Sequence, residues 1–236
     1  VTLVGDNNLF GLRVSLNLSN AVSGSGGLIV GKSPVGPGTG ALFLYGANTY
    51  TGPTIISNNS ALVLGPSSSL GASSPIQVGS GATLDASALS SLSLGAGQIL
   101  LGSGTCAGNY VFGTGATLAP GFPDSATYTL TMSGNLTLQS GSTNLVVVNK
   151  TSSVANDPVG GLTSVGIGGT LVINSVGNAL TAGDAIHLFS ATAASGAFDN
   201  IIPATPGANL LWDTSTLLTD GMWRVLSNGP PSQPTN

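Results

Sequence analysis

One short segment, Val78-Gly-Ser-Gly-Ala-Thr-Leu84, recurs along the chain and points to the fold. It returns as Phe112-Gly-Thr-Gly-Ala-Thr-Leu118, and a looser copy reads Val165-Gly-Ile-Gly-Gly-Thr-Leu171. Each copy has glycine where a turn requires a positive φ, followed by a small residue, a threonine and an inward leucine. Self-similar segments of this kind are typical of repeat proteins in which each unit packs against its neighbours. The repetition therefore predicts the stacked coils of a β-solenoid.

The sequence around these turns is built of short β-prone runs. The chain contains 36 Gly and 13 Pro, and they separate runs rich in Leu, Val, Ile and Thr. We expect strands at Leu28–Val30, Ala41–Tyr45, Thr54–Ser57, Ala61–Leu64, Ile76–Val78, Ile99–Leu101, Tyr128–Met132, Asn135–Leu138, Asn144–Asn149, Thr170–Ile173 and Ala185–Phe189. The predicted fold class is all-β, a parallel β-solenoid (β-helix) with a C-terminal β cap unit. The alternative is a set of β-sandwich-like repeat units.

Four segments are expected along the chain. Residues 1–19 form an N-terminal strand segment, in which the alternating stretch Leu12–Leu18 could pair with the edge of another subunit. Residues 20–155 form the solenoid repeats, residues 156–228 a C-terminal β cap or extension, and residues 229–236 a Pro-rich tail.

Charge is the unusual feature of the composition. Only 5% of the residues are charged, with 4 Lys+Arg against 8 Asp+Glu, whereas an ordinary soluble domain has about 25%. Low charge gives a free monomer little protection from association, so we expect a homo-polymer or a surface lattice. The basic residues Arg13, Lys32, Lys150 and Arg224 are scattered, which argues against nucleic-acid binding. No apolar run approaches the roughly 18 residues of a membrane-spanning helix, so no membrane span is expected.

One stretch resembles a known family. Gly46-Ala-Asn-Thr-Tyr-Thr-Gly-Pro-Thr-Ile-Ile-Ser57, continued by Ala61-Leu-Val-Leu-Gly65, is similar to the autotransporter-associated β-strand repeat. Gly115-Ala-Thr-Leu-Ala-Pro-Gly121 and Ser133-Gly-Asn-Leu-Thr-Leu138 look like segments that accompany it, and the resemblance covers most of residues 20–228. It implies a bacterial surface or secreted protein with a parallel β-helix, located outside the cell or on its outer surface. The function expected on this basis is structural, as a part of a surface assembly or filament.

The sequence predicts no enzyme and no catalytic, cofactor or metal site. The aspartates occur singly, although a polysaccharide lyase or hydrolase would need clustered acids with Arg or Lys. We interpret Asp157 and Asp184 as turn and strand-start residues that accept local backbone N–H groups, His187 as structural, and Cys106 as a small residue in a turn. Calcium bound by Asp and carbonyl oxygens remains an alternative, without the repeat motif that would favour it.

Aromatic residues and modification sites leave two further alternatives open. Tyr45 and Tyr50 near Phe43, and Trp212 near Trp223, could form a platform for glycans, which would make the protein an adhesin. For both tryptophans, covering the open end of the solenoid is the preferred interpretation. An isopeptide bond would need Lys32 or Lys150 beside a buried acid. Asn-x-Ser/Thr triplets, which we attribute to composition, begin at Asn17, Asn58, Asn135 and Asn149.

Overall fold

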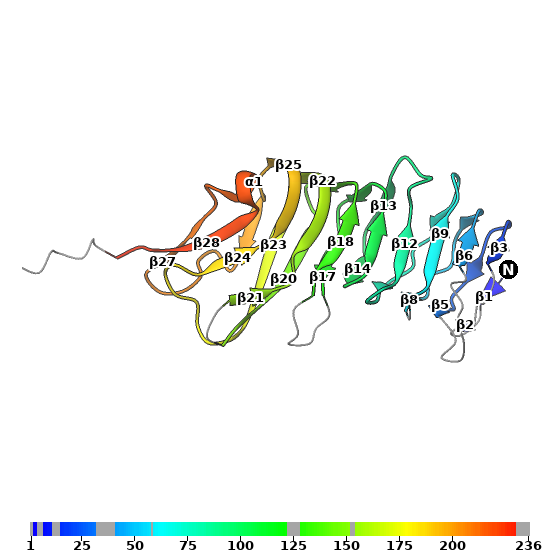
Figure 1. Ribbon diagram of the computed structural model, residues 1–236, viewed down its shortest axis with the longest axis horizontal. Helices are drawn as coiled ribbons and strands as arrows, with labels where there is room; N and C mark the ends of the chain where they lie inside the picture. The colour runs from blue at the N-terminus through cyan, green and yellow to red at the C-terminus, as the bar shows by residue number, and fades with distance from the viewer. Residues whose placement is uncertain are drawn as a thin grey trace, which may run out of the picture.

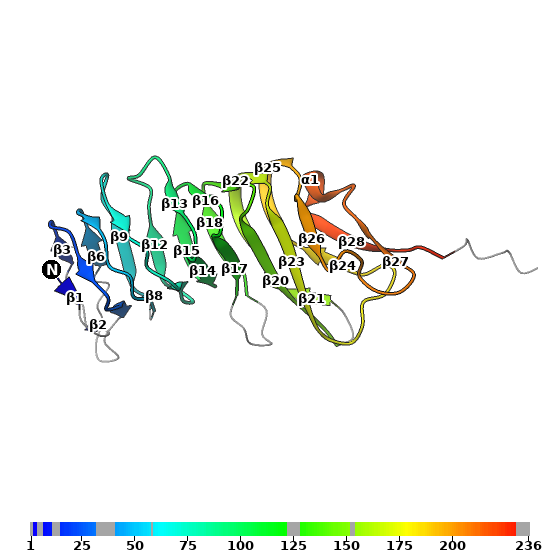
Figure 2. The same cartoon turned by 180° about the vertical axis from the view of Figure 1, so that it is seen from behind.

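The protein is a parallel β-solenoid, as a computed structural model shows (Figures 1 and 2). The structure describes residues 2–3, 7–10, 15–31, 41–57, 59–121, 128–151 and 154–229. Strands of successive coils lie side by side along an elongated molecule, with the first coil at one end and a small cap at the other (Figure 1). The predicted fold class is confirmed.

The first long sheet contains one strand from every coil. In spatial order its parallel strands are β2 (Asn7–Phe10), β5 (Leu28–Gly31), β8 (Thr54–Ile56), β11 (Ile76–Val78), β14 (Ile99–Gly102), β17 (Thr117–Pro120), β20 (Thr143–Lys150), β23 (Thr170–Gly177) and β26 (Asn200–Ile202). A short strand, β21 (Val154–Asn156), pairs antiparallel with β20.

The second long sheet consists of two parallel ladders that meet on one strand. One ladder holds β3 (Leu16–Leu18), β6 (Ala41–Leu44), β9 (Ala61–Leu64), β12 (Thr83–Asp85), β15 (Thr105–Ala107) and β18 (Leu130–Ser133), and the other holds β13 (Leu92–Leu94), β16 (Tyr110–Phe112) and β19 (Asn135–Leu138). Both ladders end on β22 (Val159–Ile167), which is long enough to pair with β18 and with β19. Beyond it lies β25 (Phe189–Gly196).

Two pairs of very short strands line the remaining side of the early coils. They are β1 (Thr2–Leu3) with β4 (Ser23–Gly24), and β7 (Ala47–Asn48) with β10 (Ser69–Leu70). The cap is an antiparallel sheet of β24 (Ala185–His187), β28 (Met222–Ser227) and β27 (Leu210–Asp213), with the one-turn helix α1 (Leu217–Asp220) beside it.

The core is a column of side chains from stacked strands. Alternate residues of each strand point inward, and equivalent positions in successive coils lie directly above one another. In the second sheet the inward column runs through Leu42, Leu62, Leu84, Cys106 and Met132, all 0–1% exposed. Leu84 is the inward leucine of the first repeat copy, so the predicted role of that position is confirmed.

The repeated turn has the geometry that its sequence predicts. Gly81 and Gly115 have φ of 72° and 78°, and the next residues, Ala82 and Ala116, are buried and donate their N–H to the carbonyls of Gly79 and Gly113. This is a four-residue turn whose third position needs a positive φ, which glycine adopts without strain.

Copies of the motif occupy two different corners of the coil. Val78–Leu84 connects β11 in the first sheet to β12 in the second, whereas Phe112–Leu118 connects β16 in the second sheet to β17 in the first. The looser copy, Val165–Leu171, occupies the same corner as the Phe112 copy. Thr117 pairs with Thr143 of β20, and Thr143 pairs in turn with Thr170. The spacing of the first two copies is therefore not the length of a coil.

The observed strands can be compared with the four expected segments. Leu16–Leu18 pairs on one edge as β3 with β6 of its own chain, so its pairing with another subunit stays a prediction, and Leu12–Val14 lie outside the described residues. The two long sheets continue past residue 155 to β25 and β26, so the region predicted as a cap or extension contains both further coil strands and the cap. Of the Pro-rich tail, only Gly229 is described.

Candidate functional site

The cap brings together residues that are far apart in the sequence. Register in its sheet places Arg224 between Ala185 and Asp213, and Met222 opposite His187. Because side chains alternate along a strand, these residues share one face of the sheet, and Trp223 and Val225 share the other. Trp223 and Val225 are buried against the last coil, whereas the face that carries Arg224 is half-exposed. The cap therefore has an apolar inner face and a polar outer face.

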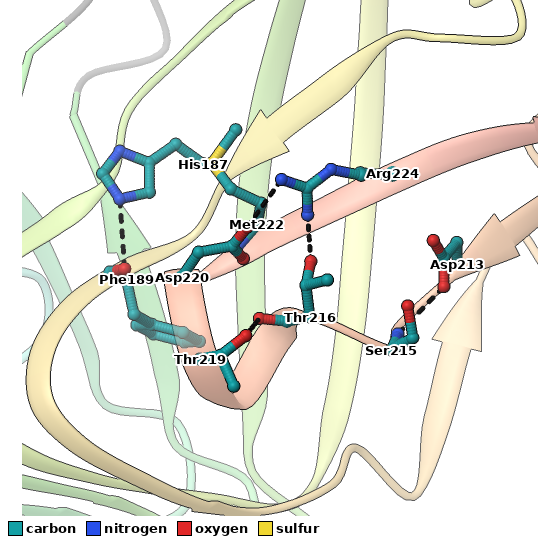
Figure 3. Close-up of polar contacts among 9 residues, drawn as sticks. All are labelled: His187, Phe189, Asp213, Ser215, Thr216, Thr219, Asp220, Met222 and Arg224. Carbon is teal, nitrogen blue, oxygen red and sulfur yellow. Dashed lines mark hydrogen bonds and ion pairs between the residues drawn. The ribbon is translucent and has the colours of Figure 1, made fainter.

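Arg224 is the centre of the polar face (Figure 3). Its guanidinium donates to the Asp220 carboxylate, with 2.6 Å between Nη2 and Oδ2, and to the Thr216 hydroxyl. The hydrogen bond from Arg224 lowers the pKa of Asp220 to about 2. The pKa of Asp213 is also lowered, chiefly by hydrogen bonds from Ser215. Both acids are therefore ionised at neutral pH, and neither is poised to donate a proton.

The sequence did not predict the cluster of Asp213, Asp220 and Arg224, because the aspartates occur singly along the chain. Asp213 lies on β27, and the antiparallel pairing of β27 with β28 brings it opposite Arg224. Asp220 ends α1, four residues before Arg224 in the sequence. A polysaccharide lyase or hydrolase would need clustered acids beside an arginine or lysine, and this cluster has that composition. Here the guanidinium is engaged by Thr216 and Asp220 of its own cap, an arrangement that fastens α1 to β28.

His187 lies at the other end of the same outer face (Figure 3). Its Nε2 is 3.1 Å from the carbonyl oxygen of Phe189 and 3.1 Å from Ser190 Oγ. A carbonyl only accepts, so a hydrogen bond to Phe189 requires the tautomer in which Nε2 carries the proton. In that tautomer Nε2 does not take a proton from Ser190. The side-chain amide of Asn156 makes two hydrogen bonds to the main chain of His187. Its oxygen accepts from the His187 N–H at 3.1 Å, and its nitrogen donates to the His187 carbonyl at 2.7 Å.

Lys150 and Asp184 form an ion pair at the side of the cap. Lys150 Nζ lies 2.6 Å from Asp184 Oδ2, and the side chains are 11% and 14% exposed. Thr181 donates its backbone N–H to the same oxygen at 2.6 Å. Burial of the Asp184 carboxyl opposes ionisation, but the hydrogen bonds from Lys150 and Thr181 outweigh it and hold its pKa below the ordinary value. We required a lysine beside a buried acid for an isopeptide bond. Lys150 does not meet this condition, because Asp184 is only partly buried, and Lys32 lies outside the described residues.

The two aspartates interpreted as turn residues behave differently. Asp184 directly precedes β24 and accepts from Thr181 three residues earlier, which is the expected local pattern. Asp157 is buried and accepts the backbone N–H of Tyr128, which is distant in sequence. The local interpretation of Asp157 is therefore incomplete, because its carboxylate connects β22 to the segment before β18.

The aromatic residues divide between the core, the cap and the outer surface. Tyr50 is fully buried, its hydroxyl lies 2.7 Å from Thr54 Oγ1, and burial raises its pKa to about 12. It therefore cannot belong to a surface platform. Tyr45 is 43% exposed, and its ring lies nearly parallel to that of Phe43, with 6.4 Å between ring centres. Only Phe43 and Tyr45 of the first predicted platform lie together on the surface.

Both tryptophans belong to the cap, as predicted. Trp223 is 2% exposed and makes edge-on contacts with Phe198 of the last coil and with Trp212, at 5.9 Å and 6.2 Å between ring centres. Trp212 Nε1 donates to the carbonyl of Pro203. These contacts cover the end of the core with aromatic surface. The interpretation of Cys106 as a turn residue is wrong, because Cys106 lies in strand β15 with its side chain in the core column. Burial raises the pKa of its thiol to about 12.

Other predicted site residues stay separate. Among the described residues, no three side chains of His, Cys, Asp or Glu lie close enough together to hold a metal ion. Within the same part of the chain, no helix is long and apolar enough to cross a membrane. Asn135 is exposed and accepts from Ser164 at 2.8 Å, Asn17 is exposed on β3, and Asn58 lies outside the described residues.

Comparison with known proteins adds no family. No protein-family model matches the chain, and no curated protein matches it.

Proposed function

We propose that this chain is an extracellular structural protein that forms or decorates a bacterial surface assembly through its solenoid. The proposal keeps the resemblance to the autotransporter-associated β-strand repeat as its reason for a bacterial surface location. The fold supports a structural role because stacked coils can be extended along one axis without changing their local pairing.

The observation that carries the proposal is the near absence of charge on the outer faces of the two long sheets, which form the walls of the solenoid. Residues 41–149 contain two charged side chains, Asp85 and Asp124. Asp85 caps its own turn by accepting from the N–H and the hydroxyl of Ser87 at 2.9 Å and 2.6 Å, and Asp124 lies outside the described residues. The described walls therefore present hydroxyls, amides and small apolar groups, which impose little electrostatic cost when two walls meet.

Imaging of the purified protein tests the proposal directly. We expect ordered filaments or sheets in negative stain, and a scattering mass in neutral buffer that rises with protein concentration. A particle that stays monomeric at high concentration, with no ordered assembly on the grid, would contradict it.

Glycan adhesion is a second candidate, favoured by the exposed ring pair of Phe43 and Tyr45. A glycan array should then show binding that Tyr45→Ala abolishes. The matched control is Trp212→Phe, which removes the N–H that Pro203 accepts but leaves the platform intact. Binding lost in both variants or in neither would argue against this surface.

A further inference from the structure

A cavity of about 330 Å³ lies between the last coil and the cap. On the coil side it is lined by Ala197 and Phe198, from the connection between β25 and β26, and by Ile201 of β26. On the cap side it is lined by Leu217 and Leu218 of α1 and by Trp223 of β28. The cavity thus forms where the regular coil meets an antiparallel sheet, and their side chains do not interdigitate there.

The chemistry of the lining selects the kind of molecule that can enter. Every residue that lines the cavity is uncharged, and Thr214 supplies the one hydroxyl. The lining therefore disfavours ions and favours an apolar body, and the Thr214 hydroxyl of the lining can hydrogen-bond an oxygen atom.

The volume sets the size of the molecule. Since one water occupies about 30 Å³ of liquid, the cavity accommodates about ten non-hydrogen atoms. Its volume lies at the lower end of small-molecule sites, which are mostly apolar with a few placed polar groups. Leu218 is 45% exposed, so it forms an edge of the cavity that faces solvent.

We propose that this cavity is a binding site for a compact neutral molecule that is largely apolar and carries one carbonyl or hydroxyl oxygen. Phe198 and Trp223 would contact its apolar body, and the Thr214 hydroxyl would donate to its oxygen. The site lies in one copy of the chain, so it is independent of the proposed assembly and can be tested on dispersed protein.

The experiment uses cyclohexyl methyl ketone as the probe and the isosteric cyclohexanecarboxylate as its charged match. The chain contains two tryptophans, so the two indole N–H resonances in a nitrogen–proton correlation spectrum both report on the cap. We expect the ketone to shift the Trp223 resonance saturably, with a Kd of about 1 mM, as is reasonable for a fragment of this size. The carboxylate should bind at least about tenfold more weakly, because its charge would be desolvated.

A matched pair of variants locates the site. Ala197→Phe fills the cavity and should weaken ketone binding at least tenfold, whereas Ala193→Phe places the same ring on exposed β25 outside the lining and should leave binding unchanged. Absence of any shift at either indole, equal binding of ketone and carboxylate, or unchanged binding by a folded Ala197→Phe would each overturn the proposal. The two-probe comparison needs only the unaltered protein, so the test holds even if Ala197→Phe fails to fold.

Discussion

At the scale of single residues, the two glycines of the turn Gly95–Gln98 have different roles. This turn lies beside the Phe112 copy of the repeat, since Gly97 donates its N–H to the carbonyl of Gly115. Gly97 has φ of 79°, whereas Gly95, two residues earlier in the same turn, has no positive φ. An added Cβ would meet nothing within 4 Å at either position. Any difference between alanine substitutions at the two sites therefore reports backbone conformation alone.

We expect Gly97→Ala to destabilise the protein by about 1 kcal/mol, because a left-handed conformation is strained for alanine. Gly95→Ala should be neutral or stabilise by up to about 0.5 kcal/mol, through the lower entropy of its unfolded chain. Urea unfolding followed by circular dichroism measures both. Equal effects of the two substitutions would refute the conformational explanation.

Asn144 interrupts an otherwise apolar position of the core. In the first sheet it pairs with Leu118 on one side and Leu171 on the other. It is 2% exposed, and its Oδ1 accepts no hydrogen bond from any residue that the structure describes. Such an acceptor loses its bonds to water on folding and gains none in return.

Asn144→Leu should therefore stabilise the protein by about 1–2 kcal/mol, since it removes the unsatisfied group and extends the leucine column. Asn174→Leu on the exposed part of β23 is the matched control and should change stability by less than about 0.5 kcal/mol. A raised midpoint of urea unfolding for Asn144→Leu alone is the expected result. A lower midpoint would show that the asparagine is needed in the core.

At the scale of elements, the ion pair of Lys150 and Asp184 joins the end of β20 to the start of β24. The pKa of Asp184 is depressed in the folded protein, so its contribution to stability is fully present above the unfolded carboxyl pKa of about 3.9. That contribution is lost as the pH falls through the folded value. The clamp between the last coils and the cap is thus sensitive to acid and insensitive to mild base.

Asp184→Asn should accordingly lower the unfolding temperature at pH 7, and its difference from the parent protein should shrink as the pH is lowered from the unfolded carboxyl pKa of about 3.9 toward about pH 2. Ser195→Asn, at an exposed position of β25, serves as the control and should behave like the parent protein at both pH values. Calorimetry over this range provides the measurement. A difference between Asp184→Asn and parent that persists unchanged at pH 2 would assign the effect to packing and not to charge.

At the scale of the whole molecule, the walls and the end of the solenoid offer different surfaces for self-association. Ile99, on the outward side of β14 in the wall, is 36% exposed, and Ile202, on the last strand β26, is 54% exposed. Among the described residues no strand pairs with the outer edge of β26, and the cap stands beside it (Figure 2). One new charge at each site can therefore distinguish lateral from axial contact.

If copies associate wall to wall, Ile99→Lys should raise the concentration needed for assembly about tenfold or more, because the new ammonium group would be desolvated in the contact. Ile202→Lys should leave that concentration unchanged. Static light scattering against protein concentration measures both variants. The opposite ranking would indicate end-to-end contact, and no change in either would exclude both surfaces.

The local rules of the chain could be inferred from sequence because they depend on neighbouring residues. A Gly at a position of positive φ followed by a small residue, Thr and Leu specifies a turn and an inward side chain wherever it occurs, as Gly81 and Gly115 show. The same rules made the fold class predictable. The expectation that Trp212 and Trp223 lie in the cap came instead from the need to cover the open end of the solenoid.

Tertiary structure alone decided which corner of the coil each turn occupies and which distant residues meet. The turn at Val78–Leu84 and the turn at Phe112–Leu118 are locally alike, yet they stand at different corners, because stacking against the coils on either side selects the register. Arg224 likewise approaches Asp213 only through the antiparallel register of the cap. The geometry of a turn depends on four adjacent residues. The register between strands of successive coils depends on burying the whole column of inward side chains, and no single segment contains that column.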